Sequence, residues 1–293
     1  MMMTMKHRCR YHTPLVEANE DPMMTTMQMN LLWGGQQQQQ RRRHHATTIV
    51  VGILVIIAYL TPAAFAFVPE YRGAGRLFLD TADEKEWEDL LPYGIFEGIT
   101  CNPTLLERAN QKCTIDNLHR MSNKAFMLGA DEFMCQAWGG TAQELYDIGM
   151  ELSKVDRDRV VVKVPIVSAG VQAASMLVKS NVRVCLTACY HHKQSFIASN
   201  VGAEYLAPYL GRMSDAGRDG FNECLKMQQV IGGLQGETRV LVASIRDCQT
   251  MIDLAAEGME TFTISPDVAR ELFVEKLTKE AAAAFEDAAS RNN

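Results

Sequence analysis

The sequence predicts a closed (β/α)₈ barrel, and three observations support this fold class. From Arg76 onward, short apolar runs typical of strands alternate with amphipathic stretches typical of helices, and the alternation occurs eight times. Such alternation indicates a parallel sheet with right-handed crossovers. Eight units over about 220 residues match the size of a closed TIM barrel.

An open, doubly wound sheet is the alternative fold. It has little support, because no Gly-x-Gly-x-x-Gly follows the first expected strand and the chain has no P-loop. The expected strands are 76–81, 98–102, 132–137, 160–165, 182–188, 203–209, 239–244 and 261–265. The expected helices are 82–91, 114–128, 142–154, 169–179, 193–201, 220–232 and 248–257, with tail helices from Pro266 onward.

The N-terminal part of the chain differs from the rest in composition. Residues 1–45 are polar and of low complexity, and we expect them to be disordered. His44 and His45 lack companion ligands at useful spacing, so they indicate a solvated run and not a metal site. Residues 46–67 form a hydrophobic signal or anchor segment, and residues 68–293 carry the predicted barrel.

The hydrophobic segment has the features of a targeting signal. It follows a basic run, carries no charge and reaches small residues before Ala66, as a secretory signal cleaved near Ala66 does. An uncleaved membrane anchor is the alternative, since the stretch is long enough to span a bilayer. Residues 64–69, Ala-Phe-Ala-Phe-Val-Pro, resemble the cleavage motif of bipartite presequences in algae with secondary plastids. The resemblance implies a plastid location, with the secretory pathway or membrane anchoring as alternatives.

Charge and cysteine usage exclude several functions. The first 66 residues hold 6 of the 29 basic and 3 of the 35 acidic side chains, which leaves a net charge near −9 on the remainder. An acidic body argues against nucleic-acid binding. One of the 8 cysteines, Cys9, precedes the body, and the others form no Cys-x-x-Cys pair. Cys185 and Cys189 lie four residues apart without partner ligands, so we interpret all as reduced thiols.

The fourth expected strand contains one lysine among valines. Lys163 shares a strand face with Val161 and Pro165, because side chains alternate along a strand. Apolar surroundings are expected to lower the pKa of an amine, and a neutral amine condenses with carbonyls to a Schiff base. The alternative is a lysine at a strand end whose ammonium reaches water.

Each expected strand also ends in a polar or ionisable side chain. In a parallel barrel these ends meet at one rim, where the active site lies. Each residue alone has a simpler explanation as a helix cap or surface charge. Eight together favour a reactive site around Lys163. The residues in question are Asp80, Asn102, Gln136, Lys163, Thr187, Tyr209 with Arg212, Ser244 with Arg246, and Ser265.

Six motifs in order resemble the transaldolase family, and within it the small group that includes fructose-6-phosphate aldolase. The resemblance extends from Arg76 to about Phe285 and implies a class I aldolase barrel that forms a Schiff base. The motifs are Leu-Asp-Thr at 79–81, Gly-Ile-Thr-Cys-Asn-Pro-Thr at 98–104, Val-Val-Lys-Val-Pro at 161–165, Leu-Thr-Ala at 186–188, Ala-Glu-Tyr-Leu-Ala-Pro-Tyr-Leu-Gly-Arg at 203–212 and Val-Ala-Ser-Ile-Arg at 242–246.

The resemblance implies a role for each site residue. Lys163 forms the Schiff base, and Asp80 exchanges a proton with the substrate's C4 hydroxyl. The dihydroxyacetone unit is held by Thr100 and Asn102. The imine-forming and hydrolytic water is positioned by Gln136, Thr187 and Tyr209, and the phosphate is bound by Arg212, Ser244 and Arg246. The iminium is the electron sink, so no metal or other cofactor is expected.

The resemblance also separates two reactions. Larger transaldolases have Glu and Phe where this chain has Gln136 and Tyr209, whereas fructose-6-phosphate aldolases have Gln and Tyr. We therefore expect cleavage of fructose 6-phosphate with release of glyceraldehyde 3-phosphate. Transaldolase proper, in the pentose phosphate pathway, converts sedoheptulose 7-phosphate and glyceraldehyde 3-phosphate to erythrose 4-phosphate and fructose 6-phosphate, and is the alternative. Cys101, Trp138 and the Ile245-Arg246 pair depart from the aldolase pattern.

Two further expectations concern partners. The resemblance implies sugar-phosphate substrates and a homo-oligomer in which the C-terminal helix reaches a neighbouring subunit. A membrane is expected as a partner only through residues 46–67, if these are not removed. A non-catalytic barrel that binds sugar phosphates is the alternative of a different functional class, and the presence of both Lys163 and Asp80 argues against it.

Overall fold

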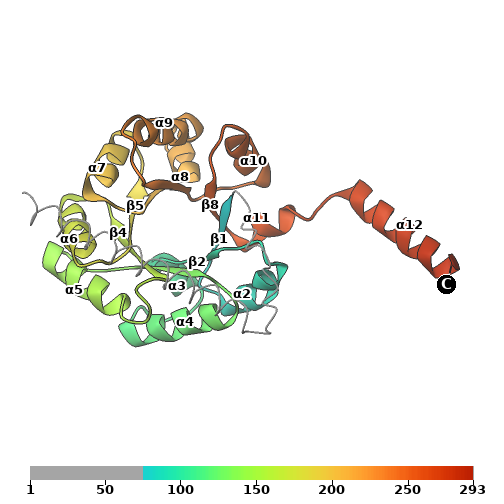
Figure 1. Ribbon diagram of the computed structural model, residues 1–293, viewed down its shortest axis with the longest axis horizontal. Coiled ribbons are helices and arrows are strands. Elements are labelled where there is room, and N and C mark those ends of the chain that lie inside the picture. The colour runs from blue at the N-terminus through green and yellow to red at the C-terminus, as the bar shows by residue number, and fades with distance from the viewer. Residues whose placement is uncertain (1–74, 293) are drawn as a thin grey trace, which may run out of the picture. The chain divides into compact units, whose positions relative to one another are not determined.

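The computed structural model describes residues 75–292, and the segments 1–45 and 46–67 lie outside the described residues. The described part forms a closed barrel of parallel strands, in which each strand pairs with its sequence neighbours and the eighth pairs with the first (Figure 1). The strands are β1 (Arg76–Asp80), β2 (Gly98–Thr100), β3 (Glu132–Gln136), β4 (Val160–Pro165), β5 (Val184–Cys189), β6 (Tyr205–Pro208), β7 (Arg239–Val242) and β8 (Thr261–Ile264). All eight predicted strands are confirmed, and their ends lie within two residues of those expected.

Helices surround this barrel in Figure 1, except α12, which projects away from it. They are α2 (Glu84–Leu90), the 3₁₀ turn η1 (Leu91–Tyr93), α3 (Pro103–Arg108), α4 (Ile115–Met127), α5 (Ala142–Leu152), α6 (Ser168–Lys179), α7 (Lys193–Val201), α8 (Leu210–Asp215), α9 (Gly220–Gly233), α10 (Cys248–Ala256), α11 (Pro266–Glu271) and α12 (Lys276–Asn292). The seven helices predicted between strands are confirmed as α2, α4, α5, α6, α7, α9 and α10. Among residues 75–292, no helix is both long and apolar enough to cross a membrane.

The sequence analysis missed two helices of six residues, α3 and α8. Six residues span less than two turns, so no apolar periodicity can develop. Local chemistry forms α3 instead: Pro103 occupies its first turn, and the Asn102 side chain accepts a hydrogen bond from the backbone N–H of Leu105. Both helices begin directly after a predicted site residue, Asn102 or Tyr209, and so they extend the rim of the barrel.

Side chains of the strands divide into two cores. A small buried cluster contains residues from one face of each contributing strand. Its members include Phe78, Met134, Val161, Tyr205 and Leu241. The neighbouring strand residues belong to a larger cluster that includes the buried helix faces. The first set therefore fills the barrel interior and the second lies between the strands and the helices.

Charged residues fill the N-terminal end of the barrel. The carboxylate of Glu132, at the start of β3, accepts hydrogen bonds from Arg76 (2.7 Å) and from the Tyr205 hydroxyl (2.9 Å), and it pairs with Arg183. Arg183 also forms an ion pair with Glu204 at 2.7 Å. Burial acts to raise the pKa of Glu204, but hydrogen bonds and charge from Arg183 lower it below its ordinary value. These groups are partly or fully buried, so their mutual pairing offsets their removal from water.

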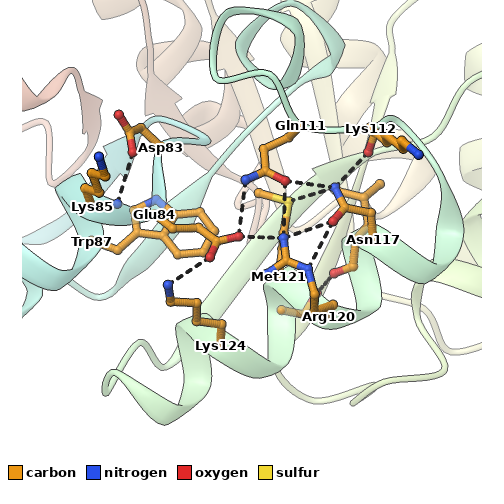
Figure 2. A network of polar contacts seen from close by, with 12 residues as sticks. Asp83, Glu84, Lys85, Trp87, Gln111, Lys112, Asn117, Arg120, Met121 and Lys124 are labelled. Carbon is orange, nitrogen blue, oxygen red and sulfur yellow. Dashed lines mark hydrogen bonds and ion pairs between the residues drawn. The ribbon is translucent and has the colours of Figure 1, made fainter.

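A polar network outside the barrel joins α2 to α4 (Figure 2). Glu84 of α2 accepts a hydrogen bond from Arg120 at 2.6 Å and pairs with Lys124 at 2.8 Å, both on α4. Burial opposes ionisation of Glu84, but its bonds to Arg120 and Lys124 lower its pKa below the ordinary value. Gln111 and Asn117 hold Arg120 from the other side, as Figure 2 shows. The network therefore holds α4 and the loop that precedes it against α2.

Candidate active site

A cavity of about 380 Å³ lies among residues at the C-terminal ends of the strands. Its lining includes seven of the ten predicted site residues: Asp80, Asn102, Lys163, Tyr209, Arg212, Ser244 and Arg246. The other three lie next to lining residues: Thr100 pairs with Asp80, Gln136 pairs with Lys163, and the Thr187 hydroxyl lies 3.0 Å from that of Tyr209. The structure thus brings together side chains that lie up to 166 residues apart in the sequence. Their individual roles stay predictions.

Lys163 occupies the interior face of β4. Its side chain is 3 % exposed and lines the cavity, so it does not reach bulk water as the alternative interpretation required. Val161, two residues earlier, lies in the interior cluster, while Val162 and Val164 lie in the outer core. The predicted alternation is confirmed. Gln136 of β3 and Cys185 of β5 are the register partners of Lys163 and point to the same side of the sheet.

The expected lowering of the lysine pKa is wrong. Burial acts to lower the pKa of Lys163, but the charges of Tyr209 and Asp80 act against it and leave the pKa above its ordinary value. The sequence placed Asp80 and Tyr209 at the same rim as Lys163, but it did not contain their distances to the amine, so their effect on its pKa did not enter the expectation. The resting amine is therefore an ammonium, and it must lose its proton to a neighbour before it can attack a carbonyl.

Asp80 is held by two threonines. Thr100 Oγ1 donates a hydrogen bond to Asp80 Oδ1 at 2.7 Å, and Thr100 Oγ1 lies 2.6 Å from Thr263 Oγ1. A hydroxyl has a single proton, so Thr263 is the donor in the second bond. Thr100 is fully buried, and in this structure its hydroxyl proton is used in the hydrogen bond to Asp80. Thr263 was missed in the sequence, although it lies on the same strand face as Thr261 and Ser265.

Tyr209 and Thr187 form a second pair beside the lysine. Their hydroxyl oxygens are 3.0 Å apart, and Thr187 is buried. The Tyr209 ring meets Tyr190 edge to face, with centroids 5.8 Å apart. The guanidinium of Arg212 lies over the same ring, 4.8 Å from its centroid. These contacts hold the phenol from three sides.

Asn102 reaches the cavity from the end of β2. Its Oδ1 accepts the hydrogen bond from the Leu105 N–H that caps α3. The remaining donor of this side chain is the amide NH₂ group. An amide nitrogen at the cavity wall suits a hydroxyl or carbonyl oxygen of a sugar, which is the predicted role of this residue.

The basic end of the cavity is built by β7 and α8. A Cβ on Gly211 would lie 2.3 Å from the Ser244 carbonyl oxygen, so only glycine permits this approach. The close approach brings Arg212, the next residue, to the end of β7, where Ser244 and Arg246 also line the cavity. Ser244 has φ of 60°, a strained conformation that costs roughly 1–3 kcal/mol. Arg246 also forms an exposed ion pair with Asp215 at 2.7 Å.

Three further charged side chains line the cavity and were not predicted as site residues. Arg108 lies on α3, and Asp267 and Glu271 lie on α11. Arg108 follows Asn102 by six residues, on a helix too short to be recognised by periodicity. The cavity therefore carries three arginines and Lys163 beside three carboxylates, those of Asp80, Asp267 and Glu271, and the planar guanidinium groups suit an anionic group of a ligand.

The thiols around the lysine are not competing nucleophiles. Burial raises the pKa of Cys101 to about 12 and that of Cys185 to about 12, although the charge of Lys163 acts in the opposite direction. Both thiols stay protonated at neutral pH. All seven cysteines of residues 75–292 are free.

One group of possible metal ligands occurs in the described part of the chain. His191 and His192 follow β5, and Glu223 lies on α9. The sequence analysis found no metal-ligand cluster in the body, because Glu223 is 31 residues beyond His192 and only the fold brings them together.

Comparisons with known proteins agree with this geometry. The family model described as Transaldolase/Fructose-6-phosphate aldolase matches residues 77–293. A "Probable transaldolase" of Dictyoglomus turgidum is 27 % identical over 203 residues, which cover 69 % of this chain and 92 % of that protein. A "Probable transaldolase" of Leptospira biflexa is 28 % identical over 222 residues, covering 74 % and 99 %. One from Methanococcus maripaludis is 28 % identical over 210 residues, covering 72 % and 95 %. This chain belongs to the transaldolase/fructose-6-phosphate aldolase family of sugar-phosphate enzymes.

Proposed function

We propose that this enzyme is a Schiff-base aldolase that cleaves fructose 6-phosphate to dihydroxyacetone and glyceraldehyde 3-phosphate. One observation carries the proposal: the buried amine of Lys163 lines the same cavity as the Asp80 carboxylate and the arginines Arg212 and Arg246. A nucleophile, a proton carrier and a phosphate-binding end are the groups that such a reaction needs.

The first step is imine formation. Lys163 is an ammonium at rest. The Asp80 carboxylate lines the same cavity and is the group placed to take its proton and to return it to the departing hydroxyl of the carbinolamine. The neutral Nζ then adds to the C2 carbonyl of the ketose, and the carbinolamine loses water to leave a protonated imine. The Tyr209–Thr187 hydroxyl pair, with oxygens 3.0 Å apart, supports positioning of this water.

Bond cleavage follows from the electron demand of the iminium. Asp80 accepts the proton of the C4 hydroxyl, the C3–C4 bond breaks, and its electron pair flows into the iminium. The aldehyde phosphate leaves and a three-carbon enamine stays on Lys163. Thr100 and Thr263 hold Asp80 in one orientation, which supports its role as the proton carrier.

The fate of the enamine separates an aldolase from a transferase. An aldolase protonates the enamine and hydrolyses the resulting imine, so it needs a proton donor and a water. The Tyr209 hydroxyl is a donor of that kind, and the neutral side chain of Gln136 lies in register with Lys163. Both features support hydrolysis.

Transaldolase proper is the second candidate. Curated relatives from three organisms carry the name "Probable transaldolase" at 27–28 % identity. In this reaction the enamine attacks an aldose phosphate, and the product ketose leaves by hydrolysis of its imine. The same residues serve the first half of both reactions.

The experiment uses the full chain with fructose 6-phosphate as the sole substrate. Continuous release of glyceraldehyde 3-phosphate over many turnovers is expected for the aldolase. A single stoichiometric burst that becomes turnover only after addition of erythrose 4-phosphate assigns the transferase instead. No release under either condition, with no carbonyl compound trapped on Lys163 by borohydride, contradicts both and favours a sugar-phosphate-binding barrel.

We also propose that residues before the barrel direct the protein to a plastid. The support is the uncharged segment 46–67 and the Ala-Phe-Ala-Phe-Val-Pro run at 64–69. Residues 1–75 fused to a fluorescent protein should direct it to the plastid of an alga with secondary plastids. Fluorescence in the secretory pathway or at a membrane contradicts this location.

We propose a homo-oligomer as well, assembled through the C-terminal helix. Within the described chain, α12 buries none of its side chains, and Leu277 and Phe285 on it are 71 % and 74 % exposed. Light scattering should give a mass above that of one chain, and a chain ending at 275 should give a smaller assembly. An unchanged mass contradicts the role of α12.

A further inference from the structure

We propose that His191, His192 and Glu223 form a binding site for a divalent transition metal such as Zn²⁺. The two histidines lie in the loop between β5 and α7, and Glu223 projects from α9. One ligand atom from each lies within 4.8 Å of the others. None of the three residues lines the catalytic cavity, so this site is separate from the sugar-phosphate site.

The separations between ligand atoms fit a tetrahedral ion. Ligand bonds of about 2.0–2.1 Å at tetrahedral angles place ligand atoms about 3.3–3.4 Å apart. The distance from Glu223 Oε2 to His192 Nδ1 is 3.0 Å, and that to His191 Nδ1 is 3.9 Å. The two distances lie on either side of this value, and the two imidazole rings lie next to each other, with centroids 4.3 Å apart. Water completes the fourth position.

The donor set selects the class of metal. Two imidazoles with one carboxylate suit Zn²⁺, Ni²⁺ or Cu²⁺, whereas Mg²⁺ and Ca²⁺ prefer oxygen ligands alone.

Neighbouring groups hold the ligands in place. The backbone N–H of His192 donates to Glu223 Oε2 at 2.8 Å, and the Glu223 side chain is only 14 % exposed. Gln194 Oε1 accepts hydrogen bonds from the N–H groups of Tyr190 (2.9 Å) and His191 (3.0 Å). His191 Nδ1 accepts a longer bond of 3.2 Å from the Lys193 N–H, which a metal at this nitrogen displaces. Such outer contacts orient ligands before the ion arrives.

The position of the site connects it to the active site. Tyr190 directly precedes His191, and its ring packs on Tyr209, which lines the catalytic cavity. An ion that joins His191 and His192 to Glu223 fixes the loop on α9, and with it the support of Tyr209. The simpler alternative is a metal-independent histidine–glutamate pair that only fastens the loop.

The test measures metal binding and not catalysis, so its failure is distinguishable from failure of the proposed aldolase function. Full-length protein is titrated with Co²⁺ and followed by its visible absorption, and with Zn²⁺ by calorimetry. We expect one site in the described barrel whose affinity falls in Glu223→Gln and in the double variant His191→Gln/His192→Gln by more than the about 10- to 100-fold that loss of an outer contact costs. Mg²⁺ should compete with neither ion.

The matched control removes the other histidine pair, His44 and His45, by substitution with Ala. Retention of the site in this control and its loss in the barrel variants supports the proposal. Equal binding in wild type and Glu223→Gln, or loss of binding in the His44/His45 control, overturns it. Melting temperature without metal verifies folding, and the single variant His191→Gln replaces the double one if that fails to fold. Zn²⁺ should also slow amide exchange in residues 189–195 of the wild type and of the His44/His45 control, but not in Glu223→Gln.

Discussion

The hydroxyl of Tyr209 lies 3.0 Å from the hydroxyl of Thr187, and this pair joins the ends of β5 and β6 beside the buried Lys163. Neither hydroxyl could be placed relative to the amine from the sequence. The contact gives the phenol a fixed orientation, and Tyr209 lines the same cavity as Lys163. In the proposed mechanism, this pair is the feature most directly connected to the fate of the enamine.

Replacement of Tyr209 by Phe should change the reaction more than the binding. Loss of the hydroxyl removes a proton carrier, so hydrolytic turnover on fructose 6-phosphate should fall about 10²- to 10⁴-fold. Transfer to erythrose 4-phosphate should fall less, and the ratio of the two rates is the measurement. Tyr146→Phe is the matched control, because the Tyr146 hydroxyl bonds to Ser180 between α5 and α6. Equal losses in both reactions contradict the role of Tyr209 in hydrolysis.

Replacement of Lys163 by Met should abolish covalent chemistry while keeping the fold. Met fills the same interior position without an amine, and activity should fall by about 10⁴-fold or more. Borohydride with dihydroxyacetone should add the mass of one reduced adduct to the wild type and none to the variant. The exposed Lys179→Met on α6 should behave as wild type. An adduct on the Lys163→Met protein places the nucleophile elsewhere.

Replacement of Asp80 by Asn should move the pH dependence of imine formation. Burial lowers the pKa of Lys163, while Tyr209 and Asp80 raise it, so removal of the carboxylate lowers that pKa. Below its pKa, the neutral fraction of an amine grows about tenfold per pH unit, so the variant should reach half-maximal trapping at a lower pH than wild type. Trapping with dihydroxyacetone isolates this step, because no C3–C4 bond has to break. A shift to higher pH contradicts the assigned cause.

Replacement of Glu132 by Gln should destabilise the closed N-terminal end of the barrel. The change leaves Arg76 and Arg183 without their shared carboxylate, and loss of a buried partner costs about 3–5 kcal/mol. Denaturant unfolding measures the loss. Glu151→Gln, which removes only an exposed pair with Lys154, should cost less than about 1 kcal/mol. Similar costs for the two variants contradict the importance of the buried network.

Replacement of Gln194 by Met should impair catalysis only by displacing Tyr190 and, through it, the ring of Tyr209. Its Oε1 accepts the backbone N–H groups of Tyr190 and His191, and Tyr190 supports the Tyr209 ring. We expect a fall in kcat of about tenfold with little change in KM, because the phosphate-binding end is untouched. Gln194→Glu keeps an oxygen acceptor and should restore most of the rate. Unchanged kcat in the Met variant contradicts this positioning role.

Several features of this protein follow from its sequence alone. Eight alternating runs determined the barrel, because side-chain period and crossover handedness leave few other arrangements. The two-residue period of a strand also placed Lys163 on the same face as Val161. The polar residues at the strand ends predicted which side chains lie at the C-terminal rim of the barrel. Ten site residues were predicted in this way and by family resemblance, and seven of them line one cavity.

Other features required the tertiary structure. The pKa of Lys163 depends on the distance to Tyr209 and Asp80, which sequence spacing does not contain. Thr263 on β8 hydrogen-bonds to Thr100 on β2, which in turn hydrogen-bonds to Asp80 on β1. Glu223 contacts His192 only because α9 packs beside α7. The sequence determined which faces and ends the side chains occupy, since that is set by local geometry. Closure of the barrel decided which of them touch, since contacts between distant strands depend on register and packing of the whole chain.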